Sequence, residues 1–179
     1  MRPLIYYAAT SLDGFIAGPN DEIDWLFTDG DYGFREFFDS LDTIITGRKT
    51  WDISKTFEEI PFKDKDIVVF SRSGCEIHSR SKENSLDKLG QINDPVDLTK
   101  RLLAMKGSNI WLLGGGDIAG QLANAGLISD LVVSIHPIFI GSGIPLFAGL
   151  DKRLRLELLK CEPFPSGLLQ ITYKVVNDA

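Results

Sequence analysis

The sequence of 179 residues is poor in the residue types that bind metals or form disulfide bonds. It has two cysteines, Cys75 and Cys161, and two histidines, His78 and His136, and none of them stands in a metal-ligand spacing. This pattern excludes a disulfide-dense scaffold and favours reduced thiols in a cytoplasmic protein. No apolar run approaches the length that spans a bilayer, so we expect neither a metal site nor a membrane partner.

Basic residues are fewer than acidic ones. The 19 lysines and arginines against 25 aspartates and glutamates give a formal charge of −6, so we expect no broad surface for nucleic acid. A small basic patch for one phosphate group is still compatible with this balance. With 44% hydrophobic and 25% charged residues and no internal repeat, the chain is expected to fold as a single domain over residues 1–179.

Near-continuous apolar runs alternate with helical patterns along the first three quarters of the chain. Such runs are typical of strands that are buried on both faces, as in a parallel sheet. They cover residues 4–9, 43–46, 67–70, 110–113 and 131–135. The polar residues 76–93, in contrast, are predicted to form a long surface loop.

Helices are predicted between these strands, where apolar residues recur every three or four positions. One begins near Phe34 and includes Leu41 in its apolar stripe. A second begins at the cap-and-proline pair Asp94-Pro95, and a third begins at Asp117 as its N-cap.

The last quarter of the chain changes to a period of two. Leu154, Leu156 and Leu158 alternate with charged residues, and a second alternating run spans residues 169–175. With the turn at 163–167, this pattern predicts an antiparallel hairpin whose apolar side could serve as an interface. The expected fold class is therefore α/β, with a central, mostly parallel sheet that ends in this hairpin.

The strongest local motif is a buried strand followed by Gly114-Gly115-Gly116 and the start of a helix. Glycines let a backbone approach a phosphate closely, and a helix N-terminus offers free N–H groups and a positive dipole end. Gly114, Gly116 and Ala119 fit a dinucleotide fingerprint, but the next strand lacks the acidic residue that would bind a ribose. The alternative is a tight turn that needs glycine for steric reasons alone.

Two other strand ends also suit a phosphate. Gly47-Arg48-Lys49-Thr50 follows one strand, and Ser71-Arg72-Ser73 follows the next. Because ligands bind at the carboxyl ends of parallel strands, we expect the three junctions to form one site. Arg48, Ser71 and Arg72 would suit a phosphomonoester such as the 2′-phosphate of NADPH, and the three glycines would take its pyrophosphate.

At this point the chain resembles a known family. Four segments occur in matching order: residues 8–17 with the sequence AATSLDGFIA, 47–51 with GRKTW, 114–116 with GGG, and 141–147 with GSGIPLF. Together they resemble the dihydrofolate-reductase-like family, most closely its riboflavin-biosynthesis branch, the C-terminal reductase domain of the bifunctional deaminase–reductase. The resemblance implies helices on both faces of the sheet, an NADPH cofactor and a homodimer.

The resemblance also implies roles for individual residues on the cofactor side. The cofactor-binding set is Ala9, Ile16, Gly47, Arg48, Lys49, Thr50, Ser71, Arg72, Gly114, Gly115, Gly116, Asp117 and Ile118. Within it, the backbones of Ala9 and Ile16 would bind the nicotinamide carboxamide, beside a mobile loop at residues 12–14. A cis peptide bond is implied between Gly114 and Gly115.

On the substrate side, the resemblance places Asp31 at the position of the acid that binds and helps to protonate the heterocycle, and Ser134 at the position of its hydroxyl partner. Asp31 also stands where an aspartate commonly caps a helix, which is the alternative. The implied activity is hydride transfer from NADPH to a ribosylaminopyrimidine-like small molecule, as in 5-amino-6-(5-phosphoribosylamino)uracil reductases. A dihydrofolate or pterin reductase, a non-catalytic NADPH-binding module and a plain structural domain are the alternatives.

Overall fold

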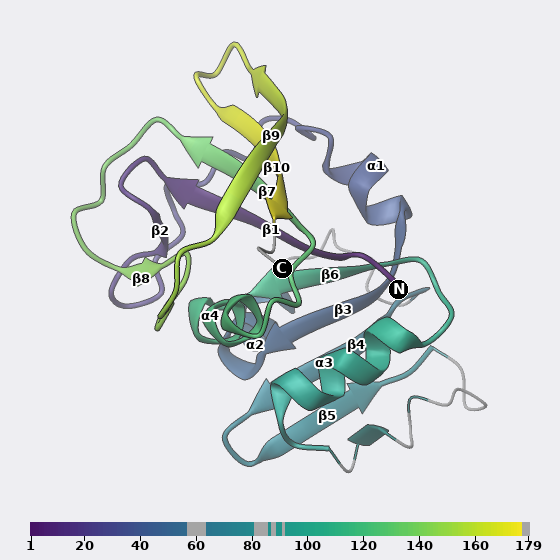
Figure 1. Cartoon of the computed structure of the whole chain (residues 1–179). Helices are drawn as coiled ribbons and strands as arrows, with labels where there is room; N and C mark the ends of the chain where they lie inside the picture. The colour runs from purple at the N-terminus through teal and green to yellow at the C-terminus, as the bar shows by residue number, and fades with distance from the viewer. Residues whose placement is uncertain (57–63, 81–85, 87–88, 91, 177–179) are drawn as a thin grey trace.

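The computed structural model describes residues 1–56, 64–80, 86, 89–90 and 92–176. Within them, eight strands form one twisted sheet in the order β5-β4-β3-β6-β1-β7-β10-β9 (Figure 1). Their bounds are β1 Leu4–Ser11, β3 Leu41–Gly47, β4 Asp66–Ser71, β5 Gly74–His78, β6 Asn109–Gly114, β7 Asp130–His136, β9 Arg155–Pro163 and β10 Leu169–Val176. The predicted fold class, α/β with a mostly parallel sheet, is confirmed.

The centre of the sheet is parallel and its two borders are antiparallel. β4, β3, β6, β1 and β7 run in the same direction, with registers such as Ile5 beside Trp111 and Ile44 beside Ile67. All five match the apolar runs of the sequence. The predicted C-terminal hairpin is formed by β9 and β10, and β10 pairs antiparallel with β7.

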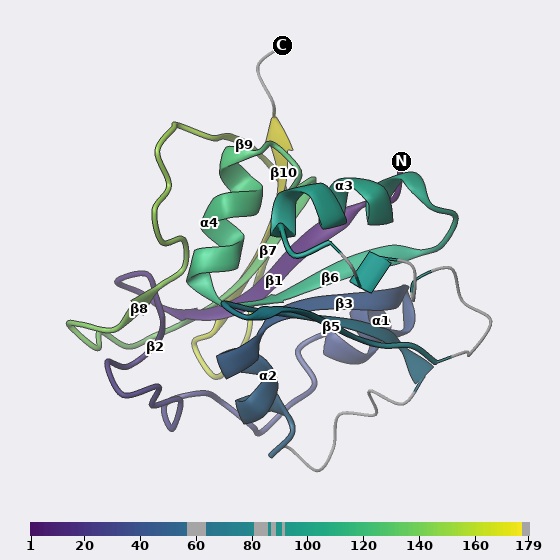
Figure 2. The ribbon, with the colours of Figure 1, turned by 90° about the horizontal axis from the view of Figure 1, so that it is seen from below.

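Helices cover both faces of the sheet, α3 and α4 on one face and α1 and α2 on the other (Figure 2). Their bounds are α1 Phe34–Asp39, α2 Arg48–Ser54, α3 Pro95–Ala104 and α4 Gly116–Asn124. Along each central strand, successive side chains point to opposite faces of the sheet and pack against the helices there. Tyr6 and Leu112 pack in the cluster beneath α3 and α4, whereas Tyr7 and Trp111 pack with Phe38 and Trp51 from α1 and α2. Because apolar side chains are buried on both faces, the central strands lack a polar alternation.

The structure confirms one predicted helix start and corrects two other details. The Asp94 side chain accepts a hydrogen bond from Asp97 N at 2.8 Å, which makes it the N-cap of α3 as predicted. The N-cap of α4 is Gly115, so Asp117 lies inside the first turn of that helix. Leu41 begins β3 and does not extend α1, since the chain leaves the helix at Ser40.

The expected loop at 76–93 is wrong in its first part. Residues up to His78 belong to β5, a border strand that pairs antiparallel with β4 and places Glu76 opposite Val69. β5 alternates half-buried and exposed residues and lacks the continuous apolar run of its neighbours, so its sequence resembles a polar loop. Part of the remaining stretch lies outside the described residues.

A second, small sheet joins two segments that the sequence did not indicate as strands. β2, Phe15–Ala17, pairs with β8, Ile144–Pro145, and Leu146 N donates to Gly14 O at 3.0 Å. Among the described residues, no helix is long and apolar enough to span a bilayer.

Candidate active-site cleft

Three strand ends that carry phosphate-compatible residues meet at one edge of the sheet. β4, β3 and β6 are neighbours and parallel, so Ser71, Gly47 and Gly114 end side by side. A methyl group placed on Gly47 would lie 3.8 Å from Gly115 N and 3.8 Å from Ile118 Cγ1. The predicted convergence of the three junctions is therefore present, and they line an open cleft of about 2280 Å³.

The turn from β6 into α4 has an unusual backbone. Gly114 has a φ of +134° and is joined to Gly115 by a cis peptide bond, as the family resemblance implied. No hydrogen-bond partner for the N–H groups of Gly116, Asp117 and Ile118 occurs in the described part of the chain, where Gly115 has no side chain to cap them. Three free donors at the start of a helix that faces a cleft form a suitable site for an anionic group.

Steric packing also requires glycine at this turn. A methyl group on Gly116 would lie 2.4 Å from the carbonyl oxygen of Pro145, and one on Gly120 would lie 1.8 Å from that of Ala148. Both contacts are with backbone, which cannot move as a flexible side chain can. The steric and the anion-binding interpretations therefore apply to different glycines of the same motif: Gly116 and Gly120 admit a neighbouring backbone, and Gly114 and Gly115 shape the turn.

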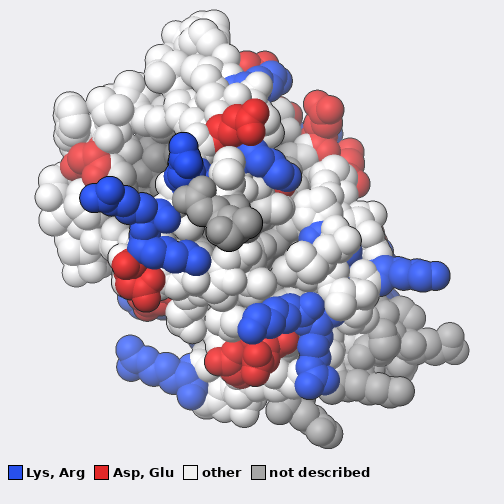
Figure 3. All heavy atoms as spheres, in the orientation of Figure 1, with Lys and Arg blue, Asp and Glu red and all other residues white. Residues whose placement is uncertain are grey.

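The basic residues at this edge differ in their partners. Arg48 forms an ion pair with Glu76 and lies 3.9 Å from Asp52, and Lys49 lies 2.8 Å from Asp21. Arg72 is exposed, with no ion pair to any residue of the described ranges. On the face shown in Figure 3, basic side chains are mixed with acidic ones.

The two segments most typical of the resembled family lie against each other. Leu12 N donates to Ile138 O at 2.8 Å, and the Asp13 carboxylate accepts from Ile140 N at 3.2 Å and Gly141 N at 2.8 Å. A hydrogen bond from Ser11 and these two backbone donors lower the pKa of the Asp13 carboxyl. The 12–14 loop is thus held to the 138–141 segment, and Ala9 and Ile16, which stand on either side of this loop in the chain, line the cleft.

The two predicted substrate residues, Asp31 and Ser134, both line the cleft, but their surroundings differ. Asp31 is exposed, and its Oδ1 accepts from Arg35 N in the first turn of α1 at 3.1 Å; the N-cap of α1 is Gly33, however, so Asp31 lies two residues before the cap position that the alternative interpretation gave it. Ser134 is buried, and its Oγ lies 3.5 Å from Gln170 Nε2. Within the described residues no hydrogen bond joins Asp31 to Ser134.

Two polar residues that the sequence did not single out stand beside Ser134. Gln170 Nε2 donates to Tyr7 Oη at 2.6 Å and to Tyr32 O at 2.8 Å, and Tyr7 also shares a hydrogen bond with Ser134. Burial raises the pKa of the Tyr7 phenol, so the hydroxyl keeps its proton at neutral pH. Tyr7 lies in an apolar strand run and Gln170 on the predicted wet face of β10, so only the β1-β7-β10 neighbourhood reveals the group.

A buried histidine anchors the segment that leads to Asp31. His136 is 3% exposed, its Nε2 accepts from Phe27 N at 3.1 Å, and its Nδ1 lies 3.2 Å from Ser134 O. The Phe27 and Trp25 rings pack on the imidazole with centroids 4.9 and 5.3 Å away. These contacts need the neutral ring with its proton on Nδ1, and burial lowers the pKa of His136.

Comparisons with known proteins agree with this arrangement. A model of the RibD C-terminal domain family matches residues 2–170. YyaP, an uncharacterized protein of Bacillus subtilis (strain 168), is 34% identical over 177 residues, which are 96% of this chain and 94% of YyaP.

Solved structures share the fold at lower identity. A pyrimidine reductase-like protein from Corynebacterium diphtheriae has a TM-score of 0.74 at 18% identity, and the match covers 99% of this chain and 93% of that one. Dihydrofolate reductase from Enterococcus faecalis, solved with NADP(H), has a TM-score of 0.60 at 15% identity, over 98% of this chain and 97% of that one.

The sheet order and the cleft at its carboxyl edge therefore define an α/β protein of the dihydrofolate-reductase-like class. Within that class, the chain belongs to the RibD C-terminal domain family, a family of riboflavin-pathway-type reductases. This confirms the resemblance that the sequence motifs indicated.

His136 makes stability depend on pH in a defined direction. Its pKa is lower in the folded chain than the ordinary value of 6.5, so below about pH 6.5 the unfolded chain binds more protons and the folded state loses stability as pH falls. We expect urea denaturation to give a lower free energy of unfolding at pH 5.5 than at pH 7.5. His136→Gln should reduce stability at pH 7.5 by about 1–3 kcal/mol through the lost buried hydrogen bonds and should flatten this pH dependence.

The other histidine provides the control, since His78 lies at an exposed strand position. His78→Gln should keep the slope between pH 5.5 and 7.5. An unchanged slope in His136→Gln would show that other groups produce the pH dependence.

Proposed function

We propose that this chain is an NADPH-dependent reductase that transfers a hydride to a ribosylaminopyrimidine-like heterocycle. The observation that carries the proposal is the meeting of the β3, β4 and β6 ends in one cleft of a RibD C-terminal domain. There, free N–H groups at the start of α4 lie at the same sheet edge as basic side chains. A dinucleotide with three phosphate groups requires both kinds of donor.

The residues of the cleft fit such a cofactor. The first turn of α4 would hold the pyrophosphate, and Arg48, Ser71 and Arg72 would hold the 2′-phosphate. Thr50 lies close to the β6–α4 turn, because a methyl group on Gly115 would lie 3.3 Å from its Oγ1. When bound, NADPH supplies the hydride, and the protein orients the donor beside the acceptor and excludes water.

Ser134 and Tyr7 would orient the substrate, since both are buried polar residues that line the same cleft, and Gln170, which contacts both, would hold them in place. Asp31 would supply the proton that accompanies the hydride. A dihydrofolate or pterin reductase is the second candidate, because an acid in this place would equally serve a pterin ring.

Cofactor binding is the first test. We expect NADPH to bind with micromolar affinity in a titration that follows nicotinamide fluorescence, and NADH to bind at least tenfold more weakly. Each charge-assisted bond to the 2′-phosphate contributes about 1.5–3 kcal/mol, so Arg72→Gln should remove most of this preference. Arg101→Gln, which changes an exposed arginine on α3, is the matched control and should bind both cofactors as the wild type does. Equal binding of NADH and NADPH by the wild type would contradict the proposed phosphate site.

Asp31→Asn separates the two interpretations of this residue. Asparagine keeps an oxygen acceptor for Arg35 N, so we expect the fold and NADPH affinity to persist. If Asp31 is the acid, kcat with the preferred substrate should fall about a hundredfold or more. Initial rates with a ribosylaminopyrimidine and with dihydrofolate measure this loss and identify the substrate class. Full activity in the variant would mean that Asp31 only supports the first turn of α1 through Arg35 N.

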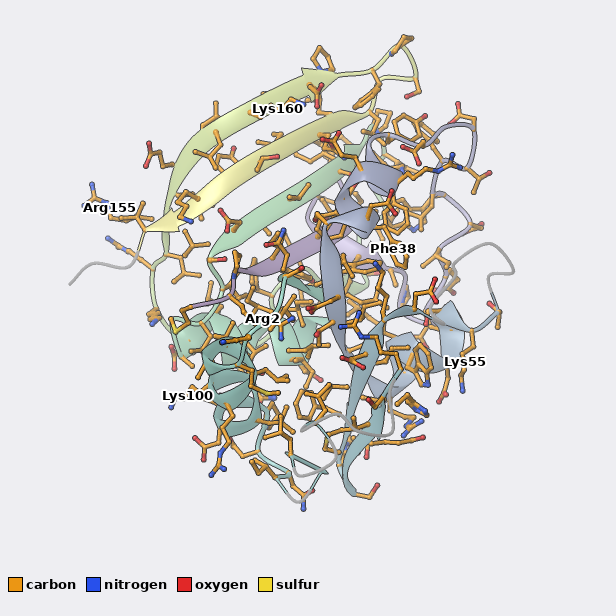
Figure 4. All side chains as sticks on the ribbon, turned by 90° about the vertical axis from the view of Figure 1, so that its right-hand side faces the viewer. Arg2, Phe38, Lys55, Lys100, Arg155 and Lys160 are labelled. Carbon is orange, nitrogen blue, oxygen red and sulfur yellow. The ribbon has the colours of Figure 1, made fainter. Side chains whose placement is uncertain are left out.

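We also propose that the protein is a homodimer that associates through β9. This strand forms a sheet border within the described residues, at the opposite border from β5 (Figure 4). Leu156 and Leu158 are 43% and 57% exposed, although they stand opposite Val175 and Tyr173, which pack into the core. An apolar border strand left open in this way favours association with another chain.

Light scattering after size exclusion tests this proposal. We expect about 40 kDa for the wild type at 10 µM, twice the 19.9 kDa of one chain, and a monomer for Leu158→Glu. Lys100→Glu, on α3, should remain dimeric and controls for the added negative charge. A wild-type monomer would contradict the proposal.

A further inference from the structure

A carboxylate that the reaction does not require lies against one of the cofactor-side cations. Glu76 of β5 pairs in register with Val69 of β4, whose side chain packs with Trp51 of α2. Because opposite residues of two strands share a face, Glu76 points to the side of the sheet that α2 covers. There its Oε2 forms an ion pair with Arg48 Nη2.

Two further ionisable side chains lie beside this ion pair. Arg48 Nη1 lies 3.9 Å from Asp52 Oδ1, and Glu76 Oε1 lies 2.9 Å from His78 Nε2. The hydrogen bond from Arg48 lowers the pKa of the Glu76 carboxyl, which keeps it ionised at neutral pH. The guanidinium that would meet the 2′-phosphate is therefore already bound to a full negative charge of the protein itself.

We propose that Glu76 is a specificity-determining residue, which competes with the 2′-phosphate of the cofactor for Arg48 and so sets the preference between NADPH and NADH. The inference rests on the proposed function and adds a residue to it. A phosphate that approaches Arg48 must displace the Glu76 carboxylate or share the guanidinium with it. In both cases the carboxylate repels the phosphate, whereas a cofactor with a 2′-hydroxyl does not meet this repulsion.

The ion pair between Arg48 and Glu76 is not needed for the stability of the fold. The Arg48 and Glu76 side chains are 38% and 48% exposed, and ion pairs in such positions contribute little to folding stability. Asp52 stands one helical turn after Arg48 and can keep the guanidinium in place without Glu76. Removal of the Glu76 charge should therefore change cofactor affinity more than it changes the fold.

Glu76→Gln tests the proposal, because it removes the charge and retains the size of the side chain. The substitution removes both the attraction of Glu76 for Arg48 and its repulsion of the phosphate. Both losses favour binding of the phosphate, and solvent partly screens both interactions, so we expect NADPH to bind about threefold to tenfold more tightly. NADH affinity should change less than twofold. The gain should shrink in 0.5 M NaCl, where charges a few ångströms apart are screened. 2′,5′-ADP and 5′-AMP, measured by calorimetry, should show the same contrast without the nicotinamide.

Two further variants complete the design. Glu162→Gln neutralises an acidic residue that pairs with Lys160 on β9, and it should leave both affinities unchanged. In an Arg48→Gln background, Glu76→Gln should no longer favour NADPH, since the group under competition is absent.

The outcomes separate this inference from the function on which it rests. If the wild type and Glu76→Gln both fail to bind NADPH and 2′,5′-ADP, the proposed function fails and the inference fails with it. If the wild type binds NADPH and Glu76→Gln leaves its affinity unchanged, lowers it, or raises NADH affinity equally, only the role of Glu76 is overturned. NADPH binding that becomes measurable in Glu76→Gln alone would support competition at Arg48.

Discussion

The burial of five parallel strands between two helical layers is the constraint on which the rest of the structure depends. β4, β3, β6, β1 and β7 place mostly apolar side chains on both faces, so little of either face is left for a polar site. Apart from the group at Tyr7 and Ser134, the polar residues that could serve a ligand therefore gather where the strands end. Since the five strands are parallel, their carboxyl ends open on one edge, and residues from the end of each strand line the same cleft.

The packing of α4 shows how one segment meets two requirements. The helix must begin directly after β6 to cover the sheet, and its start must also remain open to the cleft. Gly116 and Gly120 allow the backbone at Pro145 and Ala148 to pass close to the helix, which fixes its position. The N–H groups of its first turn then remain uncapped at the cleft. A serine or aspartate at the N-cap would satisfy one of these donors within the protein and make it unavailable to an incoming phosphate.

Much of this arrangement was predictable from the sequence, because its signals are local. Runs such as 110–113 indicate buried strands without knowledge of their neighbours, and Gly114-Gly115-Gly116 marks a strand-to-helix turn by itself. The substrate end of the cleft was less predictable. Tyr7, Ser134 and Gln170 come from β1, β7 and β10, and they meet only because these strands are adjacent. In the sequence, Tyr7 looks like a core aromatic residue and Gln170 like a solvent-facing one.

Because the sequence did not indicate β5 as a strand, it also gave no sign of where Glu76 lies. Its alternating half-exposed residues carry no strong strand signal, so Glu76 looks like one more solvated acid in a polar stretch. The pairing with β4 turns that residue toward α2 and brings it to Arg48. In the fold, these charges are therefore paired with one another and are not simply solvated. Arg48 and Lys49 are each held by a carboxylate, so the affinity of either cation for a phosphate can be adjusted by a change at its partner. In this cleft, the cations provide attraction for an anion, and the acids beside them determine how much of that attraction a ligand receives.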